Sequence, residues 1–231
     1  MLTRMRHITM QFNLKDWIEW AINNDVDTRG ITFVQANPEI ISSGGVTPRS
    51  LVQFFEVIKN IESFETSEDK NMVKMLGSST LPDIIVNNFI EFVNEKYSKL
   101  PSPESIIYDY DKIEKELNEQ FWDINDRDFK RVDVINIIAT RVGILIQELA
   151  NKYKNSFDNS SDKNELDKIW NIKCTNNLTK FMKNPDMPDD IKFIIIRLCS
   201  KYLYHFNNNT EENHMRIIIQ NLKKLFDGSN N

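Results

Sequence analysis

Hydrophobic residues recur at helical spacing along most of the chain. In residues 14–21 the apolar side chains of Leu14, Trp17, Ile18 and Ala21 fall on one face of a helix. The same spacing predicts further helices over residues 28–37, 48–61, 69–76, 104–118, 132–152, 165–172, 175–182, 188–207 and 211–225, with another that begins at residue 83. Residues 6–12 alternate in part instead, and they predict one short strand.

Two helix starts carry strong local signals. Asn13 precedes the first helix and has a side chain that can accept hydrogen bonds from free backbone N–H groups, while Asp16 adds an acidic side chain to the first turn. Thr47 and Pro48 have the residue types preferred at the N-cap and at the first helical position. These residues predict that helices begin directly after Asn13 and Thr47.

Chain-breaking residues are scarce, with 6 glycines and 7 prolines among 231 residues. Such a composition favours helices, so the expected fold is all-α, a multi-helix bundle with at most one short N-terminal strand. Residues 100–103, L-P-S-P, form the clearest break and predict the main boundary between subdomains. The polar, serine-rich residues 155–164 predict a loop.

The charge balance narrows the class of protein. The formal net charge is −5, which argues against a general nucleic-acid binder because such domains carry a basic excess. No window reaches the 18 or so uninterrupted apolar residues of a membrane span, and no signal peptide is expected. Two cysteines, Cys174 and Cys199, are too few for a disulfide framework. We therefore expect a cytoplasmic protein with reduced thiols, and the three scattered histidines predict no metal site.

Familiar nucleotide-binding and hydrolase motifs are missing from the chain. It contains no G-x-x-x-x-G-K-[ST], no G-x-G-x-x-G and no G-x-S-x-G segment. The glycine pair Gly44-Gly45 is followed by no lysine at the spacing of a P-loop. If ATP is involved, most of its binding site must therefore lie elsewhere.

Three segments carry a family resemblance. Residues 2–10 read L-T-R-M-R-H-I-T-M, residues 16–21 read D-W-I-E-W-A, and residues 45–51 read G-V-T-P-R-S-L. In this order and at this spacing they resemble the end of the core and the helical lid of an AAA+ ATPase of the MoxR-like type. The resemblance covers residues 1 to about 100 and extends loosely over the rest. It implies a lid-type helical bundle.

The resemblance implies roles for two arginines. Arg4 matches a residue that is similar to an arginine finger, which reaches the γ-phosphate of ATP in a neighbouring subunit. Arg49 matches the sensor-2 arginine, which contacts nucleotide phosphates from the lid of its own subunit. A guanidinium suits both tasks because it is permanently charged and presents a fork of donors to phosphate oxygens. Arg6 is an alternative candidate for the finger.

The chain departs from the family in one large respect, because the Walker A, Walker B and sensor-1 motifs are absent. The implied layout is a remnant of the AAA+ core in residues 1–13, a helical lid in residues 14–100 and a C-terminal helical extension in residues 101–231. ATP, with Mg²⁺ bound by the missing core, would then act only together with a P-loop core chain or with neighbouring AAA+ subunits of an oligomer. No ATP hydrolysis is expected from this chain alone.

The sequence also allows an alternative without any role in ATP hydrolysis. The chain is then a non-enzymatic helical adaptor or protein-interaction module, with Arg4 on the surface and Arg49 an ordinary first-turn arginine on an exposed helix face. Trp17 and Trp20, three residues apart, are expected to pack in the core. The acidic patch of Asp109, Asp111, Glu114 and Glu116 is expected to be a solvated helix face rather than a cation site.

Overall fold

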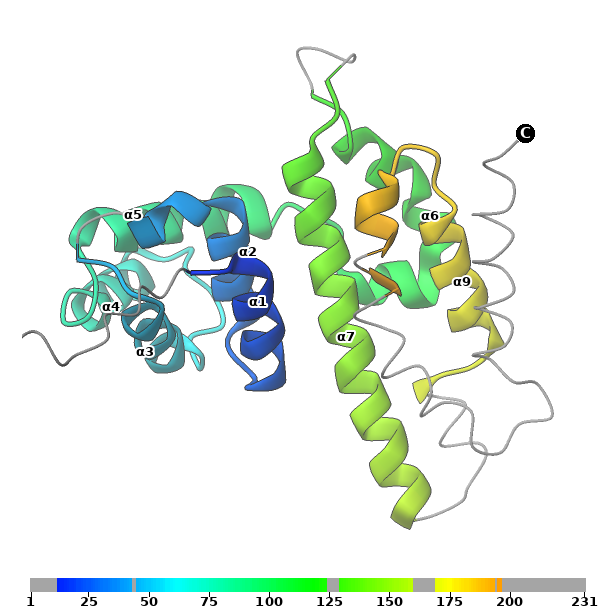
Figure 1. Ribbon diagram of the computed structural model, residues 1–231, viewed down its shortest axis with the longest axis horizontal. Coiled ribbons are helices and arrows are strands. Elements are labelled where there is room, and N and C mark those ends of the chain that lie inside the picture. Colours follow the sequence, from blue (N-terminus) through cyan, green and yellow to red (C-terminus); the bar gives the residue numbers. More distant parts are fainter. Residues whose placement is uncertain (1–11, 43–44, 124–128, 160–168, 194, 197–231) are drawn as a thin grey trace, which may run out of the picture. The chain divides into compact units, whose positions relative to one another are not determined.

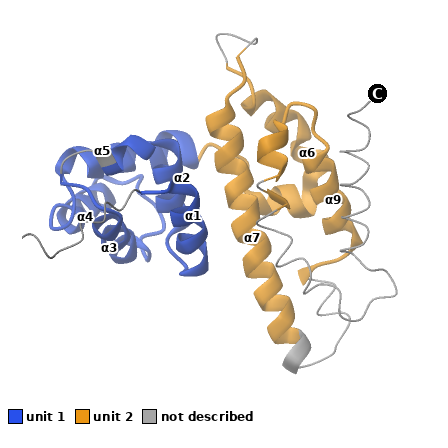
Figure 2. Ribbon diagram, viewed as in Figure 1, with its two compact units in different colours: residues 1–97 blue, residues 98–231 orange. Residues whose placement is uncertain are grey.

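The computed structural model of the protein describes residues 12–42, 45–123, 129–159, 169–193 and 195–196. The regular secondary structure of these residues is helical, which confirms the all-α prediction (Figure 1). Residues 6–11 of the predicted strand lie outside the described part. The chain divides into two compact units, residues 1–97 and residues 98–231 (Figure 2). The proline-containing residues 100–103 lie at the start of the second unit.

Unit 1 is built from short helices, and the predicted starts of two of them are correct. Asn13 caps α1 by accepting hydrogen bonds from the backbone N–H groups of Lys15 and Asp16. Thr47 caps α3 with Pro48 at its first position. The elements are α1 (Leu14–Asn23), α2 (Thr28–Ala36), the 3₁₀ helix η2 (Pro38–Ser42), α3 (Pro48–Ile58), α4 (Ser67–Gly77), α5 (Asp83–Phe92) and the π-helix η3 (Val93–Tyr97).

The core of unit 1 is a cluster of phenylalanine rings centred on Phe89. The ring of Phe89 lies 5.2 Å from Phe33, 5.3 Å from Phe54, 5.6 Å from Phe55 and 5.8 Å from Phe64, measured between ring centroids. All five side chains are at most 2% exposed. Tilted and edge-on pairs at these distances add to the stabilisation that comes from burying the rings. The cluster therefore fixes α2, α3 and α5 against one another.

Two glycines allow helices of this unit to approach closely. A Cβ added to Gly30 of α2 would lie 2.4 Å from the ring of Phe55, and one added to Gly77 of α4 would lie 2.7 Å from Val86. At either distance the added Cβ would overlap the neighbouring side chain, which would have to move. Only glycine therefore fits at these two helix contacts.

Unit 2 contains α6 (Pro103–Gln120), α7 (Val132–Asn159) and α9 (Ile172–Met182), and α6 packs along α9. The prediction of a loop over residues 155–164 is wrong for residues 155–159, which continue α7. Asparagine and serine lower helix propensity by well under about 1 kcal/mol each, and no proline interrupts the segment. The buried side chain of Tyr153 anchors this last part of the helix to the core.

The start of α9 also differs from its prediction. The expected break between residues 172 and 175 lies instead at Trp170 and Asn171, and α9 begins at Ile172. The side chain of Asn171 accepts hydrogen bonds from the backbone N–H groups of Lys173 and Cys174 at 3.0 and 3.2 Å. Because of this cap, α9 begins at Ile172 and not at residue 175, where the apolar spacing predicted its start. Of the helices described in both units, none is long and apolar enough to cross a membrane.

Candidate functional site

The start of α3 places Arg49 on a tightly fixed first turn. The hydroxyl of Thr47 accepts a hydrogen bond from the Ser50 backbone N–H at 3.1 Å, and the Ser50 hydroxyl accepts one from the Thr47 N–H at 2.9 Å. This reciprocal pair is a capping box, and Pro48 presets the backbone angle of the first helical residue. Gly45 precedes the cap with φ = 90°, a conformation that favours glycine.

The remainder of α3 is locked into the core of unit 1. Leu51, Phe54, Phe55 and Ile58 are 0% exposed and occupy one face of the helix. Arg49 is exposed, and it makes no hydrogen bond or ion pair with any residue that the structure describes. Its guanidinium therefore leaves a rigid helix at the positive end of the helix dipole, where anions are favoured. This arrangement is chemically suited to contact a phosphate group.

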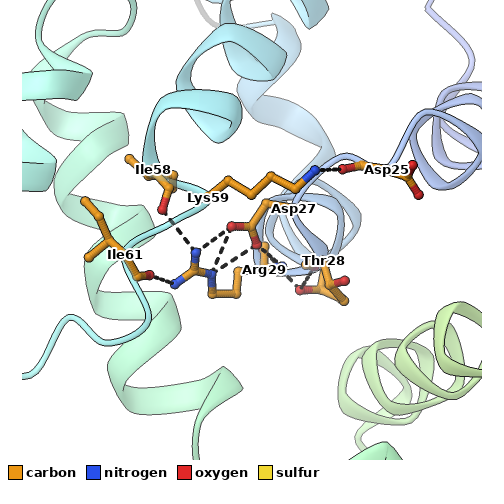
Figure 3. A network of polar contacts seen from close by, with 8 residues as sticks. Asp25, Asp27, Thr28, Arg29, Ile58, Lys59 and Ile61 are labelled. Atoms are coloured by element: carbon orange, nitrogen blue, oxygen red, sulfur yellow. Dashed lines mark hydrogen bonds and ion pairs between the residues drawn. The ribbon is translucent and has the colours of Figure 1, made fainter. Parts of the chain in front are cut away.

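The other end of α3 is held by a polar network that the sequence analysis missed. The guanidinium of Arg29 donates to the carbonyl oxygens of Ile61 at 2.6 Å and Ile58 at 3.3 Å (Figure 3). It also forms an ion pair with Asp27, whose carboxylate accepts from Arg29 Nε at 3.0 and 3.1 Å. The side chains of Arg29 and Asp27 are only 11% and 6% exposed.

Further contacts tie this network to the rest of unit 1. The Arg29 guanidinium lies 4.8 Å from the centroid of the Phe64 ring, a cation–π distance. The ammonium of Lys59, which follows α3, donates to the backbone carbonyl of Asp25 at 2.6 Å (Figure 3). A cation at a helix C-terminus also complements its negative end. Arg29 is therefore engaged in holding the fold, whereas Arg49 is free to act on a ligand.

A local signal for this network exists in the sequence. Asp27 is the N-cap of α2, and its carboxylate accepts from the backbone N–H of Arg29 at 2.9 Å. An aspartate directly before a helix, with arginine two residues later, indicates this local part. The carbonyl partners Ile58 and Ile61 lie about thirty residues away, so only the folded chain reveals them.

The other sequence-predicted candidates fall into two groups. Arg4 and Arg6 lie outside the described residues, as do Cys199 and the three histidines. Of the two tryptophans expected in the core, Trp17 is buried, but Trp20 is 48% exposed, so that prediction is wrong for Trp20. The face of α1 that carries Trp20 turns towards solvent.

Two of the four carboxylates in the acidic patch on α6, those of Asp109 and Asp111, pair with lysines. Asp109 pairs with Lys112 and with Lys173, each at 3.3 Å, and Asp111 pairs with Lys180 at 2.5 Å. Hydrogen bonds from Lys173 and Lys112 hold the pKa of Asp109 below its usual value. Across the described residues, no group of three or more His, Cys, Asp or Glu side chains is placed to hold a metal ion.

No family model, curated protein or solved structure matches this chain.

Proposed function

We propose that this chain supplies the lid of an AAA+ ATPase of the MoxR-like type, with Arg49 as the lid's contact to the phosphates of ATP. The observation that carries the proposal is the exposed Arg49 on the capped first turn of α3, whose opposite face is locked in the core. The T-P-R-S segment at residues 47–50 is also the sharpest part of the resemblance. The P-loop core that binds Mg²⁺ and ATP comes from outside these 231 residues.

In this role Arg49 couples the lid to the nucleotide state. The guanidinium gains charge-assisted hydrogen bonds when a phosphate lies within reach and loses them when that phosphate leaves. Because α3 is fixed inside unit 1, the whole unit follows the arginine. The difference in binding between the two nucleotide states then shifts the position of the lid, as in other two-state switches. The proposal also gives Arg4 the part of an arginine finger towards a neighbouring subunit.

The first test is to find the core. The tagged full-length chain is purified from its native cell, and the proteins that come with it are identified by mass spectrometry. The expected result is a co-purifying P-loop protein, with ATP hydrolysis by the complex and none by the chain alone. A chain that purifies without any P-loop protein contradicts the proposal, and the alternative of a helical adaptor or interaction module then takes its place.

The second test asks whether Arg49 acts on the nucleotide. In the isolated complex, Arg49→Ala is expected to lower the rate of ATP hydrolysis by roughly tenfold to a hundredfold, because hydrogen bonds to charged groups contribute about 1.5–3 kcal/mol. Lys15→Ala is a matched control, since Lys15 is an exposed cation at the second position of α1, as Arg49 is in α3. Equal rates for the two variants overturn the role of Arg49.

A further inference from the structure

Unit 1 contains a small open pocket where the end of α2 meets α5 and the π-helix η3. Its volume is about 190 Å³. The polar lining comes from Asn37, Asn88, Glu91, Glu95 and Lys96. The apolar lining comes from Phe33 and Phe92. None of these residues belongs to the start of α3, so the pocket is separate from Arg49.

The aromatic part of the pocket is preformed by the core. Phe33 and Phe92 are 2% and 4% exposed, and their ring centroids lie 5.5 Å apart. Phe33 also packs on Phe89 at the centre of the phenylalanine cluster. These two side chains therefore form an ordered floor beneath the polar groups, so little entropy is lost there on binding, but neither ring offers an open face for stacking.

The polar part of the pocket favours a cation. Glu91 and Glu95 are exposed, and neither makes an ion pair with any described residue. Asn37 uses its amide nitrogen to donate to the Phe33 carbonyl at 2.9 Å, which leaves its side-chain oxygen as an acceptor. Asn37 is also the C-cap of α2, at the negative end of that helix. Carboxylates, an acceptor oxygen and a helix C-terminus all attract positive charge.

The π-helix explains how these groups meet. Glu95 and Lys96 are consecutive, yet both line the pocket, and both lie in the wider turn of η3. Such turns are rare, and they occur often at functional sites. Lys96 is the one cation among the lining residues, and it forms no ion pair with either glutamate. Its charge therefore opposes a cationic ligand.

We propose that this pocket binds the guanidinium group of an arginine side chain presented by a partner protein. A planar guanidinium gives up its hydration more readily than an ammonium and can donate to carboxylates through two parallel hydrogen bonds. The volume of about 190 Å³ is enough for this group and part of its stem. The proposal does not depend on the nucleotide role of Arg49.

The test titrates the full-length, isotope-labelled chain with Nα-acetyl-arginine methylamide and follows the NMR signals of the Asn37 and Asn88 side-chain amides. We expect saturable shifts with a dissociation constant on the order of millimolar, because one side chain makes few contacts. The corresponding lysine compound is expected to bind several-fold more weakly, and the neutral citrulline compound not to bind. A lysine compound that binds as tightly as the arginine compound, or an arginine compound without saturable shifts, overturns the proposal.

Three variants sharpen the test through the sign of their effects. Glu91→Gln and Glu95→Gln should each weaken binding by roughly two- to fivefold, as expected for partly exposed charge pairs. Lys96→Ala should strengthen binding by a similar factor, since it removes the opposing charge. Glu68→Gln is the control, because Glu68 is an exposed glutamate on α4 outside the pocket. If the pocket variants bind like this control, the pocket does not recognise the cation.

Discussion

The helices inside unit 1 and the helices inside unit 2 are held by different kinds of contact. In unit 1, α2, α3 and α5 meet through phenylalanine rings around Phe89, and glycines allow close helix contacts. In unit 2, α6 and α9 also pack apolar side chains, with the ring centroids of Tyr110 and Phe181 6.5 Å apart, and polar contacts are added to this packing. The buried amide of Asn177 donates to the Ile107 carbonyl at 2.9 Å, and Asn184 donates to Asn118 at 2.6 Å. Lys173 and Lys180 of α9 pair with aspartates of α6.

This difference determines what each unit tolerates. An apolar cluster is non-directional, so its stability depends on the volume that fills it. A buried hydrogen bond depends on both partners, because a carbonyl left without a donor costs its full desolvation. The polar contacts also accompany an irregularity, since α6 has a non-helical residue at Asp109, close to the carbonyl of Ile107. Both candidate sites belong to unit 1, where apolar packing fixes the backbone beneath them.

The largest expected effect comes from emptying the centre of the phenylalanine cluster. Phe89→Ala removes a fully buried ring that contacts four others, and it should lower the free energy of unfolding by about 3–5 kcal/mol. The measurement is denaturant unfolding, combined with hydrogen exchange to locate the change. Faster exchange should be confined to residues of unit 1.

The control for this cavity is a phenylalanine in unit 2 that fills no space in a core. Phe129 is 71% exposed, so Phe129→Ala should change the unfolding free energy by less than about 0.5 kcal/mol. Equal losses for Phe89→Ala and Phe129→Ala would mean that the cluster does not carry the stability of unit 1.

A smaller effect should follow when the polar contact in unit 2 is broken. Asn177→Ala leaves the buried carbonyl of Ile107 without this donor, and it should cost about 1–3 kcal/mol. Lys180→Ala breaks only an exposed ion pair on the same helix, which should contribute less than about 1 kcal/mol. Urea unfolding of both variants checks the order. If Lys180→Ala is the more damaging, the buried contact does not organise this helix pair.

Local sequence signals account for the parts of the fold that depend on neighbouring residues. Asn13, Thr47 and Pro48 each act on groups within a few positions, so the starts of α1 and α3 were predictable. The wrong predictions for the start of α9 and for a loop at residues 155–159 arise where one structural preference outweighs another. Asn171 caps α9 ahead of the apolar repeat, and residues 155–159 stay helical despite their polarity because tertiary packing supports the preceding turn.

The candidate sites also differ in how far local sequence determines them. The exposure of Arg49 follows from its place in the first turn of an amphipathic helix, so it could be read from the sequence. The burial of Arg29 could not, because its carbonyl partners are about thirty residues away. The pocket depends both on contacts between α2 and α5 and on a π-helical turn. No pattern in residues 93–97 distinguishes that turn from an ordinary helix end.

The smallest expected effect is a pH dependence confined to unit 2. Burial raises the pKa of the Cys174 thiol above its ordinary value of 9.0, so the unfolded chain releases this proton first. The thiol's contribution to stability is therefore fully present below about pH 9 and is lost as pH rises through the folded pKa. Burial also raises the pKa values of Tyr108 and Tyr110 from 10.0. Both tyrosines therefore lose their protons mainly at higher pH, in the natural chain and in a Cys174→Ala variant. Between pH 9 and 10, the natural chain should lose stability relative to Cys174→Ala by less than about 1.4 kcal/mol, measured by urea unfolding. A difference between the two proteins that stays constant from pH 8 to 10 would show that the buried thiol does not titrate differently in the folded and unfolded states.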